Sequence, residues 1–245
     1  MPFKKITQSQ IKHLRSLQLK KYRQKYNQFI VEGTKSVLEF LNSSMLCVGI
    51  FAYEPVLENL SIDKFEDVLY VANTKQMNQL SALKQSSGLL ACFEIPTPQP
   101  VNQQEQLVIA LDDIRDPGNL GTIIRTADWF GLNQVICSKE SVDCYNPKVI
   151  QSSMGSLSRI TVHYKDLASL PLDFPEHELM IADMEGEDYR AVSFERGILV
   201  IGNEGHGVSE MITKMAHRRV SIPRIGEAES LNAAISAAII LANWS

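Results

Sequence analysis

The chain has 245 residues, of which 44% are hydrophobic and 21% are charged. This is the composition of an ordinary globular protein, which excludes collagen-like, coiled-coil and disordered chains. At roughly 150 residues per domain, the length predicts one large domain or two small ones. No apolar run approaches the roughly 20 residues of a membrane-spanning helix, and the N-terminus lacks the apolar stretch of a signal peptide. We therefore expect a soluble, cytoplasmic protein that has no membrane partner.

Charge is distributed unevenly along the chain. The formal net charge is −4, yet residues 1–25 hold eight lysines and arginines and no acidic residue. We call residues 1–25 the basic arm. A basic segment of this kind on an otherwise acidic protein often binds phosphate groups. Tyr22 lies within this arm and Tyr26 directly follows it, and their rings can stack on unpaired bases. A solvated basic helix explains the same composition equally well.

The four cysteines match no metal-binding pattern. They are 45, 45 and 7 residues apart and include no C-x-x-C pair. Cys47, Cys92 and Cys137 lie in apolar runs and are predicted to be core residues, whereas Cys144 is predicted to be an ordinary loop thiol. We expect no metal site.

The first 95 residues alternate between helical and extended patterns. Residues 7–25 predict one or two helices, and further helices are expected at 34–41 and 73–83. The predicted strands are 29–33, 47–52, 68–72 and 89–95. Residues 96–106, PTPQPVNQQEQ, are rich in proline and glutamine and predict a linker. The expected division is therefore a domain at 1–95, a linker at 96–106 and a domain at 107–245.

The second half predicts a different sheet. Continuous apolar strands are expected at 107–111, 134–137, 179–182, 198–201 and 220–222, with helices or loops between them. This alternation indicates an α/β domain whose parallel sheet is covered on both faces.

The first of three notable loops is LDDIRDPGNLGTIIRTADWFG, residues 111–131. A strand ends at Leu111, and a helix is expected to start near Asn119, where Asn119 is a possible N-cap. Leu120, Ile123 and Ile124 belong to the apolar face of this helix, and helical rotation places Arg125 on another face. Arg125 could equally be a surface salt-bridge residue.

The second loop is ILVIGNEGHGVS, residues 198–209. Its glycines do not fit a P-loop, and their G-x-x-G-x-G order fails the dinucleotide fingerprint, which disfavours a nicotinamide-dependent oxidoreductase. Glu204 would repel a polyphosphate, so the loop suits a ligand that offers hydrogen-bond donors or carries positive charge. His206 is a possible general base, but an exposed loop histidine is more often incidental.

The third loop belongs to VSIPRIGEAESLNAAISAAIILAN, residues 220–243. Ser230 is the expected N-cap of an Ala- and Ile-rich C-terminal helix, in which Ile235, Ala238 and Ile239 belong to an apolar stripe. Small residues on several faces indicate close packing against other backbone. A buried helix without further function has the same pattern.

Together the three loops resemble the ordered motifs of the SpoU (TrmH-like) RNA ribose 2′-O-methyltransferases of the SPOUT superfamily. The matching stretches are DPGNLGTIIRTADWFG, LVIGNEGHGVS and SIPRIGEAESLNAAISAAI. The first half resembles the substrate-binding domain of that family through KYRQKYNQFIVEGTKSVLEFL and SALKQSSGLLACFE, which is a shorter match. The resemblance implies a parallel-sheet domain with a deep trefoil knot, preceded by a small α/β domain that binds the RNA substrate. It also implies a homodimer through the knot region, with each site built from both chains.

The resemblance further implies S-adenosylmethionine as cofactor and tRNA or rRNA as substrate. The positions that match the polar active site of the family are Asn119, Arg125, Glu204, Ser230 and Asn232. The positions that match its cofactor site are Ile201, Gly202, Asn203, Glu204, Ile222 and Leu231. Ala233-Ala234 follows where relatives often carry Val-Ser, so no hydroxyl acts there, and the chain ends at Ser245, shortly after the motif.

The family proposal makes the arginine a base towards the ribose hydroxyl, and Arg125 is the matching residue. A guanidinium keeps its proton at neutral pH. We therefore expect Arg125 to orient an RNA phosphate and to stabilise the developing alkoxide. Two other functions fit the same motifs, namely a catalytically idle RNA-binding relative and a SPOUT enzyme that methylates a base.

Overall fold

The computed structural model describes residues 4–57, 63–83 and 85–244. Its contacts divide the chain into two compact units. Unit 1 comprises residues 1–97 and 145–158, and unit 2 comprises residues 98–144 and 159–245. The segment 145–158 therefore packs with the N-terminal residues although it lies far along the chain. The functional division at 95 and 107 stays a prediction.

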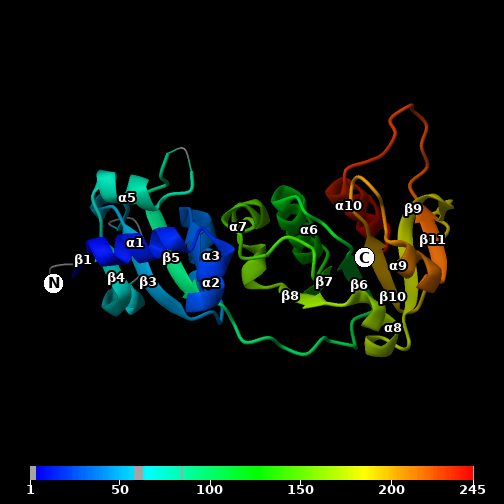
Figure 1. The fold of residues 1–245 in the computed structure, drawn as a ribbon, viewed down its shortest axis with the longest axis horizontal. Coiled ribbons are helices and arrows are strands. Elements are labelled where there is room, and N and C mark those ends of the chain that lie inside the picture. The colour runs from blue at the N-terminus through cyan, green and yellow to red at the C-terminus, as the bar shows by residue number, and fades with distance from the viewer. Residues whose placement is uncertain (1–3, 58–62, 84, 245) are drawn as a thin grey trace. The chain divides into compact units, whose positions relative to one another are not determined.

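Unit 1 is an α/β unit whose sheet has five strands (Figure 1). Its strands are β1 Lys4–Lys5, β2 Gln28–Glu32, β3 Cys47–Ala52, β4 Leu69–Val71 and β5 Leu89–Glu94. Its helices are α1 Gln8–Ser16, α2 Lys20–Tyr26, α3 Thr34–Leu41, α4 Glu54–Leu57, η1 Asp63–Val68, α5 Thr74–Leu80, α7 Pro147–Ser153 and η2 Ser156–Ser158.

The sheet of unit 1 has the order β1-β4-β3-β5-β2 and mixes parallel and antiparallel pairs. Successive side chains of β2 point to opposite faces of the sheet, and apolar side chains at both kinds of position allow both faces to be covered. Ile30 packs into the core cluster that contains residues of α1 and α5, and Phe29 stacks on Phe93 and contacts Phe40 of α3. The two apolar faces therefore hold helices on opposite sides of the sheet.

The N-terminal residues form two helices, as the sequence indicates. Thr7 caps α1 in a capping box with Gln10, and Leu19 and Asn27 flank α2. The structure corrects one feature of the basic arm, because the side chain of Arg23 is buried. Arg23 Nη1 donates to the carbonyl oxygens of Leu17 at 2.8 Å and Gln18 at 2.9 Å. Arg23 therefore holds the turn between the helices, and its charge is not part of the exposed basic surface.

Unit 2 holds a six-stranded sheet whose strands all pair in parallel. Its strands are β6 Leu107–Leu111, β7 Gln134–Ser138, β8 Thr161–Lys165, β9 Glu178–Asp188, β10 Gly197–Ile201 and β11 Arg218–Ser221. Its helices are α6 Pro117–Trp129, η3 Leu167–Ser169, α8 Leu170–Asp173, α9 Glu210–Met215 and α10 Ala233–Trp244. The parallel α/β architecture predicted from the sequence is confirmed, and β8 is an additional edge strand.

Helices cover both faces of this sheet. One face buries Val108, Val200 and Ile212 in a cluster with residues of η3 and α8. On the other side α10 packs against α6 and β10, and Figure 1 shows α10, in red, beside α6, in green. The sheet order is β11-β9-β10-β6-β7-β8, so the chain leaves β6 and β10 in opposite directions. The trefoil knot implied by the resemblance stays a prediction.

Residues 101–106, the second half of the predicted linker, lie against unit 2. The amide nitrogen of Asn102 donates to Gln134 Oε1 at 2.9 Å, and Gln134 Nε2 donates to the carbonyl oxygen of Asn102 at 2.7 Å. The ring nitrogen Nε2 of His177 lies 2.7 Å from the carbonyl oxygen of Glu105. These contacts order the segment that enters β6.

Three of the cysteines are buried and Cys47 is half-buried. Burial raises the pKa of the Cys47 thiol to about 11 and that of the Cys92 thiol to about 12. Cys144 lies in the loop between β7 and α7, as the sequence predicts, but it is buried there, and burial raises the pKa of its thiol. Thiols with raised pKa values are poor nucleophiles at neutral pH.

Candidate active site

The topology of unit 2 predicts a ligand-binding crevice at the carboxyl ends of β6 and β10. In open parallel sheets, ligands bind where neighbouring strands send their connections in opposite directions. The loops that leave β6 and β10 contact each other there. The amide nitrogen of Asp112 donates to the carbonyl oxygen of Ile201 at 2.9 Å, and the amide nitrogen of Ser209 donates to Asp112 Oδ2 at 2.8 Å.

The loop after β10 is a tight hairpin. The backbones of Asn203 and Gly207 exchange hydrogen bonds of 3.1 and 2.9 Å. A Cβ atom on Gly202 would collide with the backbone of Gly207 and Val208, so only glycine fits at Gly202. The hairpin exposes Glu204 at its tip.

Two aspartates that sequence reasoning missed support this hairpin. Asp112 and Asp113 are both buried at the end of β6, and Asp113 has a positive φ of 57°. The carbonyl oxygen of Asp113 accepts a hydrogen bond of 2.8 Å from Asn203 Nδ2. Two carboxylates directly after a buried strand were the signal in the sequence that could have identified them.

The carboxylate of Asp113 links two exposed side chains. The Arg115 guanidinium, whose Nε donates to Asp113 Oδ1 at 2.8 Å, holds the pKa of Asp113 below its ordinary value. His206 Nε2 lies 3.2 Å from Asp113 Oδ2 and lowers the pKa further. Asp113 is therefore an ionised anchor for the tip of the hairpin.

A chain of hydrogen bonds joins all three motif loops. Asn232 Nδ2 donates to Asn119 Oδ1 at 2.9 Å, and Asn119 Nδ2 donates to Glu204 Oε1. Asn119 lies in the first turn of α6, Glu204 lies after β10, and Asn232 directly precedes α10. Glu204 and Asn232 are exposed and Asn119 is half-buried, so a ligand can reach this polar cluster. The structure thus brings together three of the five predicted polar residues.

The caps of the two helices at the cluster differ from the prediction. Asp116 caps α6 by accepting a hydrogen bond of 2.8 Å from the Asn119 amide nitrogen, and Pro117 occupies the first turn. The prediction that Asn119 is the N-cap is wrong, because the N-cap is Asp116, three residues earlier, and Pro117 is the first residue of the helix. Asn232 Oδ1 accepts from the amide nitrogens of Ala234 at 2.9 Å and Ile235 at 3.3 Å. Asn232, and not Ser230, therefore caps α10.

The double use of Asn232 gives a first testable prediction. Asn232→Ala removes the cap, and we expect the free energy of unfolding to fall by about 1 kcal/mol. Asn232→Asp keeps the acceptor for the cap but removes the amide donor to Asn119. We therefore expect Asn232→Asp to retain stability in denaturant unfolding and to lose most of the catalytic activity that we assign below to the cluster. Equal activity of Asn232→Asp and the unsubstituted chain would show that the amide donor is not used.

The remaining predicted cofactor residues lie at the end of β10 and in the loop between β11 and α10. Ile201 is buried, and its carbonyl oxygen already accepts a hydrogen bond. Asn203 makes hydrogen bonds within the hairpin through its backbone and its side chain, and its Oδ1 accepts from the amide nitrogen of Gly205 at 2.8 Å. Ile222 is half-buried after β11, and the Leu231 side chain is 46% exposed. Ser230 is exposed in the loop between them. Their roles stay predictions.

Arg125 lies apart from the polar cluster of its own chain. It follows Asn119 by six residues on α6, which is almost two helical turns. Its side chain is exposed on the face that also carries Thr122 and Trp129, and the Trp129 side chain is 82% exposed. Within one chain the structure does not place Arg125 beside Glu204.

The residues beside this predicted crevice fit S-adenosylmethionine. The hairpin packs its own backbone tightly at Gly202, and this fixes the position of Glu204 at its tip. Leu231 is exposed and offers an apolar contact for uncharged parts of the cofactor, and Glu204 is exposed and offers a negative charge. A carboxylate and an apolar side chain suit a cationic ligand with apolar parts.

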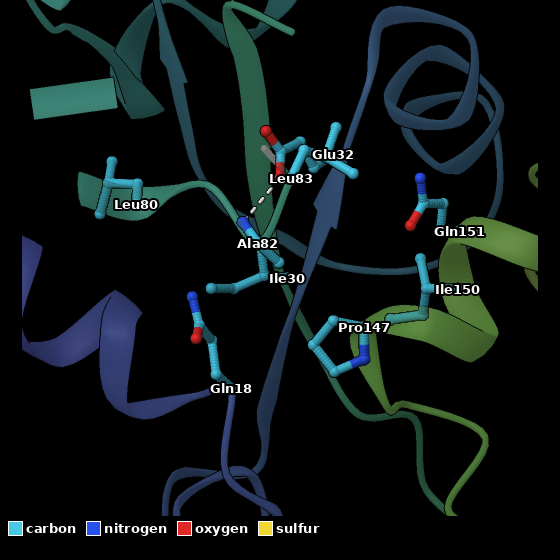
Figure 2. Close-up of a pocket in the computed structure, with 9 residues that line it drawn as sticks. All are labelled: Gln18, Ile30, Glu32, Leu80, Ala82, Leu83, Pro147, Ile150 and Gln151. Carbon is cyan, nitrogen blue, oxygen red and sulfur yellow. Dashed lines mark hydrogen bonds between the residues drawn. The ribbon is translucent and has the colours of Figure 1, made fainter. Parts of the chain in front are cut away.

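Unit 1 contains a separate pocket, shown in Figure 2. It is lined by Gln18, Ile30, Glu32, Leu80, Ala82, Leu83, Pro147, Ile150 and Gln151. Glu32 is its one carboxylate and already accepts hydrogen bonds from the amide nitrogen of Ala82 at 3.1 Å and from Ser81 Oγ at 2.5 Å. The pocket holds none of the predicted site residues.

Within the described residues 4–57, 63–83 and 85–244, no group of three or more His, Cys, Asp or Glu side chains is arranged to hold a metal ion. Likewise, none of the helices described there combines the length and the apolar character that crossing a membrane requires.

The chain matches two family models in succession. Residues 106–242 match the SpoU rRNA Methylase family, and residues 8–91 match the MRM3-like substrate binding domain. Among curated proteins, it is 29% identical over 235 residues to the 23S rRNA (guanosine(2553)-2'-O)-methyltransferase RlmP of Bacillus subtilis, with 94% of each chain covered.

The solved structures that resemble the whole chain include two bacterial proteins. A protein described as an RNA methyltransferase of the TrmH family, from Porphyromonas gingivalis, is 34% identical with a TM-score of 0.85, and 98% of each chain is covered. An rRNA methyltransferase from Sinorhizobium meliloti with bound AdoMet is 27% identical with a TM-score of 0.87, covering 98% of this chain and 95% of that one.

The parallel sheet, the polar cluster at its carboxyl edge and these likenesses define a methyltransferase of the SPOUT class. More specifically, the chain belongs to the SpoU rRNA methylase family, whose model matches more than half of it. It is an enzyme that uses S-adenosylmethionine to methylate ribose 2′-hydroxyl groups of RNA.

Proposed function

We propose that this enzyme methylates one ribose of ribosomal RNA and that the polar cluster Asn119–Glu204–Asn232 is part of its active site. The hydrogen-bond chain that joins the three motif loops carries this proposal. The likeness to RlmP along almost the whole chain favours ribosomal RNA over tRNA as the substrate.

The residues of the cluster have separate roles in this proposal. When bound, the cofactor supplies an electrophilic methyl group on a positively charged sulfonium. Glu204, held by Asn119, places negative charge on this side of the crevice. The hydrogen bond between Asn119 and Asn232 fixes both side chains, which orient the ribose. Alignment of two reactants lowers the activation free energy of such reactions by about 7–11 kcal/mol. Ser230, Ile222 and Leu231 complete the predicted walls.

We assign Arg125 to the active site of a second copy in a homodimer. Arg125 shares its exposed helix face with Trp129, and α10 beside it exposes Ile235, whose side chain is 52% exposed. Ala238, Ile239 and Ala242 continue this apolar stripe along α10. A symmetric dimer that buries these side chains would carry each Arg125 to the partner subunit. There Arg125 would orient a phosphate and stabilise the developing alkoxide.

The location that we infer is the cytoplasm, where ribosomal RNA is available in bacteria. All four cysteines are free thiols, which is typical of reducing compartments.

Transfer of labelled methyl from S-adenosylmethionine to separated pools of unmodified rRNA and tRNA tests the substrate. We expect label in the rRNA pool with the unsubstituted enzyme and almost none with Asn119→Ala. Label confined to tRNA would contradict the substrate class. Tight cofactor binding without transfer to either RNA would favour a catalytically idle relative.

A further inference from the structure

The exposed surface of β1, α1 and α2 is strongly basic. Seven of the eight lysines and arginines in residues 1–25 are exposed, and Arg23 is the buried one. The exposed residues are Lys4, Lys5, Lys12, Arg15, Lys20, Lys21 and Lys25. Because this stretch contains no acidic residue, its local charge is uncompensated along the chain. It therefore suits a polyanion.

Two tyrosine rings lie together on α2. Tyr22 and Tyr26 are one helical turn apart, and their rings are nearly parallel at 13° with centroids 6.3 Å apart. The ring of Tyr26 also meets His13 edge-on at 4.6 Å, and His13 Nε2 lies 2.8 Å from Gln28 Oε1. The Tyr26 side chain is 39% exposed. The rings are thus held in place by neighbours and remain open to solvent.

Two lysines border these rings. Lys21 Nζ lies 4.8 Å from the ring centroid of Tyr22, and Lys25 Nζ lies 5.2 Å from that of Tyr26. Helical rotation of 100° per residue places all four side chains within about 140° on one side of α2, and the buried Arg23 lies outside this range. We call Lys21, Tyr22, Lys25 and Tyr26 the α2 face.

We propose that the α2 face binds unpaired nucleotides of the RNA substrate, with bases stacked on the tyrosine rings and phosphates paired with the lysines. This inference rests on the proposed function, which makes RNA the substrate. Rings on a rigid helix beside lysines are the combination by which proteins hold single-stranded RNA. A base-paired duplex offers charge but no open base to stack on. The α2 face therefore prefers a loop, a bulge or an unpaired end.

The test measures binding of the full-length chain to two rRNA transcripts of equal length, one with an unpaired loop and one fully paired. We expect Tyr22→Ala/Tyr26→Ala to weaken binding of the looped RNA by about tenfold or more, as loss of base stacking does. Tyr22→Phe/Tyr26→Phe keeps both rings and should bind as the unsubstituted chain does. Binding of the paired RNA should hardly change.

The lysines are tested through salt. Lys21→Gln/Lys25→Gln should reduce the slope of log K against log salt by about 1.4, at about 0.7 per phosphate contact on single strands. The matched control is Lys35→Gln/Lys75→Gln, which removes the same charge from exposed positions on α3 and α5 of unit 1. We expect the control to leave the slope nearly unchanged.

Several outcomes would overturn this inference. One is unchanged binding of the looped RNA by the alanine pair. Another is a loss of affinity that is equal for the looped and the paired RNA. A third is a salt slope of the lysine control that falls as far as the slope of the Lys21→Gln/Lys25→Gln pair. If the alanine pair unfolds, the lysine pair and its control still decide the matter. If the alanine pair binds the looped RNA normally and still transfers methyl groups, the role of the α2 face is refuted and the proposed function stands. Failure of the unsubstituted chain to bind RNA at all would contradict the proposed function itself.

Discussion

Replacing Arg125 by alanine is expected to lower kcat by about 10²–10³-fold, the usual cost of losing a group that stabilises transition-state charge. Cofactor affinity should stay the same, because the partners that we assign to Arg125 are an RNA phosphate and the developing alkoxide and not the cofactor. Arg125→Lys keeps the charge but not the planar pair of donors, so we expect it to recover little activity. Near-full turnover by Arg125→Lys would refute the role of a planar donor.

The same variant tests the dimer. Arg125→Ala and Glu204→Gln chains should each be almost inactive alone. If Arg125 acts in the site of the partner subunit, mixing the two chains creates heterodimers with one complete site, and about a quarter of the full activity should return in a statistical mixture of two-fold dimers. A mixture that stays inactive after subunit exchange would show that Arg125 and Glu204 act within one chain.

The second large effect is expected at Gly202. A Cβ atom there would meet the backbone of Gly207 and Val208, which cannot move aside as a flexible side chain does. Gly202→Ala should therefore open the hairpin, because closely packed backbone can shift to admit a methyl group only at a cost of a few kcal/mol. We expect S-adenosylmethionine to bind this variant about 100-fold more weakly, or worse. Isothermal titration calorimetry measures the effect directly.

Gly226→Ala is the matched control for this substitution. Gly226 lies in the loop before α10, and a Cβ atom on it would meet no atom within 4 Å. We expect the control to bind the cofactor with nearly unchanged affinity. Equal affinity of Gly202→Ala and Gly226→Ala would mean that the hairpin does not border the cofactor site.

Apolar periodicity predicts most of the architecture, because buried parallel strands are continuous apolar runs. It misses β8, Thr161–Lys165, whose sequence TVHYK is exposed or half-buried at the edge of the sheet. It also misses α7, although Asn146-Pro147 is a recognisable helix start and Asn146 caps the helix. Edge strands and short helices carry too few buried residues to stand out.

The site is predicted less completely than the fold. The sequence presents Asn119, Glu204 and Asn232 as separate loop residues, and only the folded chain joins them across 85 and 113 residues. Charge counting also overestimates the basic arm, because it cannot distinguish the buried Arg23 from exposed neighbours. Long-range hydrogen bonds depend on how loops meet, and no local pattern encodes them.

The most direct test of the central claim is the chemical position of the transferred methyl group. Unmodified ribosomal RNA would be treated with the enzyme and labelled S-adenosylmethionine, then digested to nucleosides and separated. We predict label in a single 2′-O-methyl nucleoside, with an alkali-resistant linkage at that position, and its loss with Asn119→Ala. Label in a methylated base, or label that Asn119→Ala does not reduce, would contradict ribose methylation by this polar cluster.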